Sequence, residues 1–163
     1  MLQESAPVVA DPLMTFEQFY LDELDVQVRR CFVLVGSSEV ANDIVHDAMI
    51  EVYQRWSTLD RPGAYLNRTV LNRVRDRGRR RLVADRSLRM MTAAERARPA
   101  GATNDVEMRG ALSGLAFNQR ACLVLRFYGN CTNAEIADAL GCRPGSVGPW
   151  IQRGLSTLRK ELS

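Results

Sequence analysis

The sequence lacks several features that define familiar classes of protein. No run approaches the ~20 consecutive apolar residues that span a bilayer. The amino-terminal segment MLQESAPVVADP has neither the basic nor the apolar part of a secretory signal. Only 6 of the 163 residues are proline and 46% are hydrophobic, a composition that argues against disorder. We therefore expect a globular cytoplasmic protein that does not enter the membrane.

Signals for metal binding and catalysis are also scarce. The four cysteines, Cys31, Cys122, Cys131 and Cys142, form no C-x-x-C pair, and His46 is the single histidine. Zinc sites ordinarily show paired close ligands. No Gly-rich phosphate loop and no H-E-x-x-H motif occurs. We expect no enzyme, no metal and no cofactor, and we interpret the cysteines as small buried thiols; a thiol sensor stays open as an alternative.

The net charge of +3 hides a strong segregation of charge along the chain. Residues 1–60 carry 11 Asp or Glu against 3 Arg, whereas residues 61–81 carry 8 Arg against one Asp. Such segregation indicates two kinds of partner surface, one of which binds an anionic partner such as nucleic acid.

Helical periodicity predicts two helices in the acidic part of the chain, over residues 16–35 and about 39–56, with Ser38 as the cap of the second. The second helix buries Val40, Ile44, Ala48 and Val52. Along the same helix run a second apolar stripe and an acidic rim, neither of which a small bundle needs. The stripe comprises Val45, Met49, Tyr53 and Trp56, and the rim Glu39, Asp43, Asp47 and Glu51.

A third helix, predicted over about 64–81, carries the strongest signal for nucleic-acid binding. At ~100° per residue, Leu66, Val70 and Val74 form one narrow apolar stripe. The polar residues on the opposite face combine guanidinium groups, which contact phosphates, with an amide that can read a base edge. These residues are Arg68, Asn72, Arg75 and Arg79.

The carboxyl-terminal part of the chain predicts a helix-turn-helix. Residues 82–104 form an expected linker, Asn104 or Asp105 caps the next helix, and Asn118 caps a helix that continues to about Tyr128. Thr132 and Glu135 form a capping box before a short helix that ends at Gly141. Ser146 is expected to cap the last helix, which places Pro149 in its first turn and makes the helix start late. Ser146, Trp150 and Arg153 face away from the apolar stripe, as side chains presented to a major groove do.

These motifs resemble those of the bacterial extracytoplasmic-function sigma factors, a group of the sigma-70 family. The run from Ala41 to Ala48, with Tyr53 and Trp56, resembles the family's second conserved region, and Ala64–Arg68 with Asn72 and Asp76 its −10-binding part. Residues 133–147 resemble the fourth region, which binds the −35 element. The resemblance implies an all-α fold of two small helical domains joined by a flexible linker. The expected ranges are a disordered tail over 1–14, region 2 over 15–81, the linker over 82–104 and region 4 over 105–163.

The resemblance also implies the partners and the residues that contact them. Core RNA polymerase would be bound through the clamp helices of its largest subunit and the flap of its second, promoter DNA would be read and melted, and an anti-sigma factor is a further candidate partner. The −10 set is Arg61, Tyr65, Arg68, Asn72, Arg75, Asp76 and Arg79; the −35 set is Thr132, Arg143, Ser146, Trp150 and Arg153; the polymerase set is Asp43, Val45, Asp47, Met49, Tyr53 and Trp56.

One segment departs from the family pattern. Gly148 and Pro149 stand where a basic and a small residue are usual, and Trp150 stands where arginine is frequent. We therefore expect fewer phosphate contacts at the −35 element. A helix-turn-helix regulator that acts without polymerase, and a sigma-like antagonist without promoter activity, remain the alternative functions.

Overall fold

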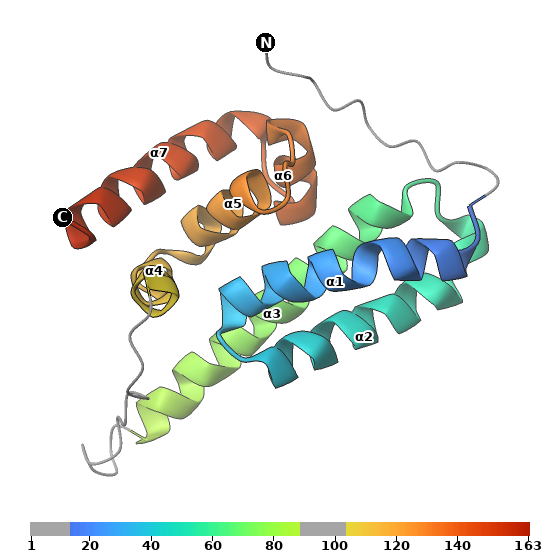
Figure 1. Ribbon diagram of the computed structural model, residues 1–163, viewed down its shortest axis with the longest axis horizontal. Helices are drawn as coiled ribbons and strands as arrows, with labels where there is room; N and C mark the ends of the chain where they lie inside the picture. The colour runs from blue at the N-terminus through green and yellow to red at the C-terminus, as the bar shows by residue number, and fades with distance from the viewer. Residues whose placement is uncertain (1–13, 89–103) are drawn as a thin grey trace.

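The structure is a computed structural model that describes residues 14–88 and 104–163, and within these ranges it contains helices and no strand (Figure 1). The first unit comprises α1 (Phe16–Val35), α2 (Ser38–Gln54), the 3₁₀ turn η1 (Trp56–Thr58) and α3 (Pro62–Leu88). The second unit comprises α4 (Asn104–Ser113), α5 (Phe117–Phe127), α6 (Asn133–Leu140) and α7 (Pro144–Glu161). The predicted all-α fold is confirmed.

Local capping interactions set the ends of the first two helices. The Thr15 hydroxyl accepts from the Gln18 backbone and the Gln18 side chain accepts from the Thr15 backbone, which satisfies two amides at the start of α1. Gly36 ends α1 with a φ of 76°, a left-handed conformation that glycine adopts at little cost. Ser37, rather than the predicted Ser38, caps α2, because its side chain accepts from the Val40 amide.

The third helix is longer than its sequence pattern predicts. It continues to Leu88, although the linker was expected to begin at residue 82. The apolar stripe that marks the helix ends at Val74, and the arginine-rich continuation shows no hydrophobic periodicity. Most of the predicted linker, and residues 1–13 of the predicted tail, lie outside the described residues.

The second unit contains the predicted helix-turn-helix. Thr132 and Glu135 form the capping box at the start of α6, and Gly141 ends that helix with a φ of 68°. Ile136, Ala137 and Val147 are buried where α6 packs on α7. The start of α5 differs from the prediction: the helix begins at Phe117, and the N-cap residue Ala116 makes no side-chain capping bond.

The predicted late start of the last helix is wrong. Helix α7 begins at Pro144 with Arg143 as its N-cap residue, so Ser146 lies inside the first turn and does not cap the helix. Proline suits the first helical position because its missing N–H has no partner there anyway. Pro149 consequently lies inside the helix, beyond the first turn.

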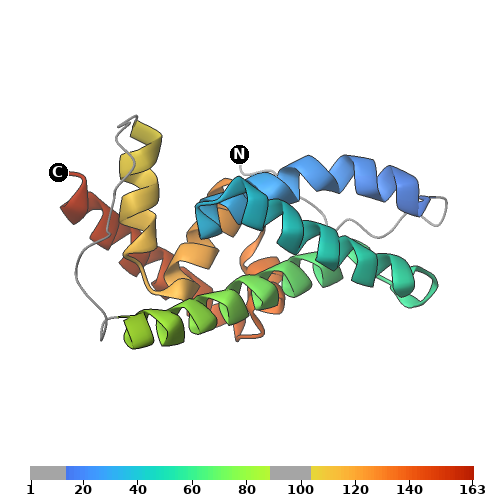
Figure 2. The ribbon, with the colours of Figure 1, turned by 90° about the horizontal axis from the view of Figure 1, so that it is seen from below.

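The two units pack against each other. Helix α6 lies beside α3, and α5 lies beside α1 (Figures 1 and 2). One hydrophobic core cluster contains buried side chains of both units, among them Leu66 and Val70 from the first and Ile136 from the second. A smaller cluster of Leu112, Leu115 and Leu123 has the half-buried Val33 of α1 packed against it. This packing determines which predicted contact residues are open to a partner.

Candidate nucleic-acid interface

The two faces of α3 separate as the sequence predicts. Leu66, Val70 and Val74 are each at most 3% exposed, whereas Arg68 and Asn72 on the opposite side are exposed. Arg61, Asp76 and Arg79 of the predicted −10 set are also exposed, and Arg75 is half-buried. The helix therefore presents a continuous polar face rich in guanidinium groups, the chemistry that binds phosphates and base edges.

The second unit covers part of this face. The Arg68 guanidinium donates to the Asp138 carboxylate Oδ1 at 2.8 Å and to the Asp138 backbone carbonyl at 3.1 and 3.2 Å. The Arg75 guanidinium donates to the Leu140 carbonyl at 3.5 Å and lies 5.1 Å from the centroid of the Phe117 ring. Both arginines thus contact α5 or α6 in this arrangement.

Tyr65 contacts the acidic rim of α2 through its hydroxyl. The hydroxyl donates to Glu51 Oε1 at 2.6 Å, and Arg73 donates to Glu51 Oε2 at 3.2 Å. The hydrogen bond with Tyr65 lowers the pKa of Glu51 and, reciprocally, raises the pKa of Tyr65. The ring of Tyr65 remains half-buried beneath the Arg55 guanidinium. Sequence reasoning missed Arg73, which connects α3 to Glu51 and Asp47 of α2.

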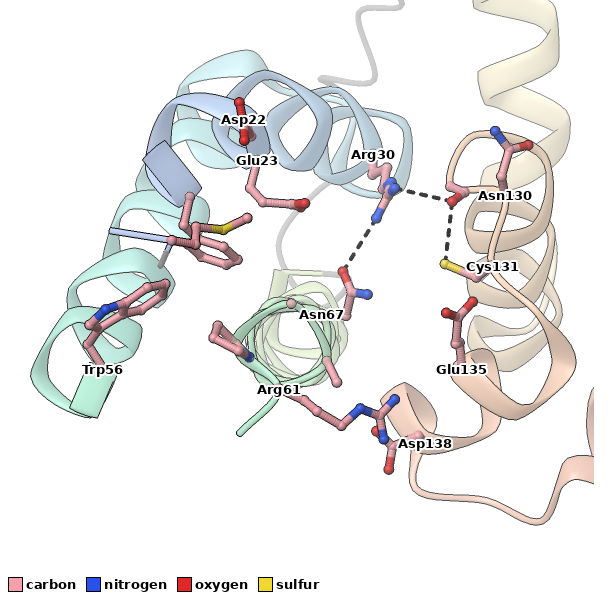
Figure 3. Close-up of a pocket in the computed structure, with 16 residues that line it drawn as sticks. Asp22, Glu23, Arg30, Trp56, Arg61, Asn67, Asn130, Cys131, Glu135 and Asp138 are labelled. Carbon is pink, nitrogen blue, oxygen red and sulfur yellow. Dashed lines mark hydrogen bonds between the residues drawn. The ribbon is translucent and has the colours of Figure 1, made fainter. Parts of the chain in front are cut away.

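A cleft of about 320 Å³ lies between the two units, bounded by α1, the start of α3 and the turn between α5 and α6 (Figure 3). Arg30 reaches across it and donates to the Gly129 carbonyl at 3.3 Å and to Asn67 Oδ1 at 3.4 Å. The buried Gln27 donates to the same Asn67 oxygen at 2.6 Å. Gly129 is needed here because a Cβ would lie 2.6 Å from the Leu125 carbonyl and 3.1 Å from Arg30. Sequence reasoning missed Gln27 and Arg30, and it placed Asn67 only within the Ala64–Arg68 motif, with no contact between the two units.

The predicted −35 residues have unequal access to solvent. Arg143 and Arg153 are exposed, whereas Ser146 and Trp150 are half-buried. Trp150 packs against the core cluster and lines a hollow between α3 and the second unit. The Thr132 hydroxyl accepts from the Glu135 amide as part of the capping box. Within the predicted −35 set, Arg143 and Arg153 are therefore the side chains open to a phosphate backbone.

The predicted polymerase stripe on α2 needs a correction. Val45 is 0% and Met49 2% exposed, so both belong to the core and present no surface to a partner. Trp56 is half-buried, with its ring centroid 5.5 Å from that of Phe16 and 5.2 Å from that of Phe19. The reason is that α1 and α3 both pack on α2, which widens its buried arc.

The residues of α2 that remain open form a smaller face. Tyr53 is 64% exposed, and Ile50, which sequence reasoning missed, is 56% exposed. Asp43 and Asp47 lie exposed on the same helix. This face combines two large apolar side chains with two carboxylates, and aromatic side chains such as that of Tyr53 are enriched in protein-binding surfaces.

The four cysteines are free thiols, three of them buried. Burial raises the pKa of Cys31 and of Cys122 to about 12, and it raises the pKa of Cys131 and Cys142 as well. Thiols of raised pKa react slowly, because the thiolate is the nucleophile. Across residues 14–88 and 104–163, no group of three His, Cys, Asp or Glu side chains is placed to hold a metal ion. None of the described helices is long and apolar enough to cross a membrane.

Comparisons with known proteins match both units. Residues 20–84 match the family model of sigma-70 region 2, and residues 105–158 match the model of sigma-70, region 4. The RNA polymerase sigma-E factor of Streptomyces coelicolor is 28% identical over 159 residues, covering 92% of this chain and 87% of that protein. The sigma-E factor of Streptomyces antibioticus is 29% identical over 157 residues, covering 92% and 86%.

Two solved structures share the fold. The sigma factor RpoE of Bartonella quintana, in complex with the anti-sigma factor NepR, aligns with a TM-score of 0.72 at 19% identity over 90% of this chain and 96% of that one. CnrH, in complex with the cytosolic domain of CnrY, aligns with a TM-score of 0.67 at 20% identity over 90% and 86%. This chain belongs to the sigma-70 family and has the regions 2 and 4 of its extracytoplasmic-function group.

Proposed function

We propose that this protein is a dissociable subunit of RNA polymerase that directs transcription from particular promoters by opening the −10 element and binding the −35 element. The observation that carries the proposal is the polar face of α3, whose exposed arginines and Asn72 lie opposite the buried stripe of Leu66 and Val70. A helix-turn-helix in the same chain supplies a second DNA-binding element. We assign no catalytic chemistry to the protein, and we propose that it acts in the cytoplasm with the polymerase.

The −10 element is assigned to α3 and the turn before it. Arg61, Arg68, Arg75 and Arg79 supply phosphate contacts, and the exposed amide of Asn72 supplies a donor and an acceptor for a base edge. Tyr65 and Asp76 complete the set. The contact between Arg68 and Asp138 must separate before Arg68 binds DNA, because a guanidinium engaged with a carboxylate is neutralised toward phosphate.

The −35 element is assigned to α7 and its cap. Arg143 and Arg153 are exposed and would contact the DNA backbone, with Thr132, Ser146 and Trp150 nearer the core side of the motif. The segment Gly148–Pro149 offers no charged side chain to a phosphate. We therefore expect the −35 contribution to affinity to be smaller than the −10 contribution.

Core RNA polymerase is assigned to the open face of α2, formed by Asp43, Asp47, Ile50 and Tyr53. These residues stay exposed although Asp47 contacts Arg73 of α3 and Tyr53 contacts Phe16 of α1, so the face is available while the bundle stays intact. We assign the clamp helices of the largest subunit to this face and the flap of the second subunit to region 4. One of the two solved structures is bound to the anti-sigma factor NepR and the other to the cytosolic domain of CnrY, and we propose an anti-sigma partner for this chain by analogy.

Run-off transcription with purified core polymerase and a library of promoter fragments tests the function. We expect defined start sites that depend on this protein, with a shared upstream sequence among the active fragments. Tight binding to core polymerase without transcription would instead indicate an antagonist. Specific binding to duplex promoter DNA in the absence of polymerase, without new start sites, would indicate an ordinary helix-turn-helix regulator.

A further inference from the structure

The carboxyl-terminal half of α3 places arginines where its core-facing stripe would continue. Counting from Leu66 at ~100° per residue, Val70 and Val74 lie at about 40° and 80°, and Arg77 and Arg81 lie at about 20° and 60°. The positions that bury apolar side chains in the first half of the helix therefore carry guanidinium groups in the second half. The −10 assignment uses the opposite face and leaves Arg77 and Arg81 unexplained.

These arginines line a cleft between the two units, with a volume of about 520 Å³. The end of α1, α3, α4 and the start of α5 form its walls. Its lining contains no Asp or Glu among the described residues. The six arginines that line it are Arg75, Arg77, Arg79, Arg81, Arg109 and Arg120. Arg77, Arg79, Arg81 and Arg120 bring like charges together in this half-enclosed space, and an anion bound between them would relieve their mutual repulsion.

Two further features concern hydrogen-bond donors in the wall of this cleft. Arg120 Nε is buried and has no hydrogen-bond partner among the described residues. Burial also lowers the pKa of Arg120, with no carboxylate to oppose the effect. The first turn of α5 begins there at Phe117 without a side-chain cap, so the first backbone amides of the helix remain open to an acceptor. Arg75 and Arg120 both lie over the Phe117 ring, at 5.1 and 5.9 Å from its centroid.

We propose that this cleft binds a small polyphosphate anion, either an inorganic chain of two or more phosphates or the phosphate chain of a nucleotide. Arginine is suited to this ligand because its planar fork donates two parallel hydrogen bonds to phosphate oxygens. The volume is that of a small-molecule site. Because the cleft has walls from both units, the anion contacts α3 and α5 together and stabilises the packed arrangement in which Arg68 is paired with Asp138.

Binding of inorganic tripolyphosphate to the full-length chain, measured by calorimetry at constant ionic strength, tests the proposal. Arg77→Gln and Arg120→Gln should each weaken binding at least tenfold. Arg80→Gln is the matched control, since Arg80 is exposed on the same helix and is not among the residues lining the cleft; its affinity should stay within twofold of the native value. Because Arg77 is exposed, Arg77→Gln should fold normally, and it tests the site even if Arg120→Gln does not fold.

Two additional measurements sharpen the outcome. Hydrogen exchange should show protection of the Phe117–Gln119 amides when tripolyphosphate is bound. Comparing tripolyphosphate with ATP and GTP distinguishes the two sources, because a nucleotide that binds more tightly than tripolyphosphate identifies a base-recognising site. An equal loss of affinity in Arg77→Gln and Arg80→Gln would overturn the proposal. These measurements use the chain without polymerase, so they fail or succeed independently of the transcription assay.

Discussion

The Arg68 guanidinium, from the face assigned to the −10 element, donates to the Asp138 carboxylate of α6 at 2.8 Å. Two further hydrogen bonds join the same guanidinium to the Asp138 backbone carbonyl. A residue assigned to DNA is therefore held by the other DNA-binding unit of the same chain. The side chains of the pair are 50% and 39% exposed, so the contact is weak enough to exchange for DNA.

Removing the carboxylate should release Arg68. We expect Asp138→Ala to raise the affinity for a single-stranded −10 oligonucleotide, in the presence of core polymerase, by about two- to fivefold, as the loss of an exposed ion pair predicts. Fluorescence anisotropy of the labelled oligonucleotide measures this. Asp25→Ala on α1, which removes an exposed carboxylate elsewhere, should leave the affinity unchanged. Unchanged binding by Asp138→Ala would show that the pair does not compete with DNA.

The exposed amide of Asn72 is expected to read the promoter without contributing to the fold. Asn72→Ala should reduce open-complex formation at least tenfold and leave the affinity for core polymerase within twofold, since each bidentate base contact is worth about 1–3 kcal/mol. Permanganate footprinting of the −10 region measures opening, and Arg80→Ala on the same helix is the control. Normal opening by Asn72→Ala would move the reading face elsewhere on α3.

Two neighbouring residues of α2 should respond in opposite ways. Tyr53→Ala is expected to weaken core polymerase binding and to lower the free energy of unfolding by only about 0.5–1.5 kcal/mol, because Tyr53 is 64% exposed and its main packing contact is the Phe16 ring. Met49→Ala should lower the free energy of unfolding by about 2–5 kcal/mol, the usual cost of a cavity at a buried site. Surface plasmon resonance and urea titration give the two readouts. Equal polymerase affinity for Tyr53→Ala and the native chain would exclude this face as the docking surface.

The buried Cys31 thiol should make stability depend on pH in the alkaline range. Burial raises the pKa of Cys31 from its ordinary value near 9 to about 12. The contribution of the protonated Cys31 thiol to the free energy of unfolding is complete below about pH 9. It is lost as the pH rises toward 12, because in that range the thiol ionises in the unfolded chain and stays protonated in the folded one. The loss is at most about 1.4 kcal/mol per pH unit.

Comparison of the native chain with Cys31→Ala isolates this effect from the titration of other groups. The difference in unfolding free energy between the two proteins should shrink as the pH rises from 9 toward 12. Chemical denaturation followed by circular dichroism at several pH values measures it. A difference that stays constant over this range would show that Cys31 titrates alike in both states.

Pro149 interrupts the hydrogen-bond ladder of α7. Because it lies inside the helix and has no N–H, Pro149→Ala should stabilise the second unit by about 1–3 kcal/mol. Thermal unfolding measures the gain, and Pro144→Ala is the control, since proline at the first helical position interrupts no bond. If Pro149→Ala brings no gain, the helix already accommodates proline there without loss.

Local features of the fold were predictable because they depend on neighbouring residues. The capping box of Thr132 and Glu135, the left-handed Gly141 and the opposed faces of α3 each follow from spacing along one helix or turn. The errors at Ser38, Asn118 and Ser146 are shifts of a few residues at helix starts. Several polar side chains can compete for one cap, and proline can begin a helix without one.

The burial of Val45 and Met49 could not be predicted in the same way. Periodicity shows that α2 has two apolar stripes, but it does not show how many helices pack on it; α1 and α3 together bury both. The same limit applies to the cleft of Figure 3, where Arg30 and Asn67 come from helices far apart in the sequence.

Composition and periodicity thus predict helices, an acidic segment over residues 1–60, an arginine face and a helix-turn-helix, because each of these properties is local or additive along the chain. Contacts between distant helices decide which of these surfaces are open: Tyr53 remains exposed, Val45 is buried, and Arg68 is paired with Asp138. The arginine cleft also depends on contacts between distant helices. Arg77 and Arg120 are 43 positions apart, and only the packing of the two units brings them to one site.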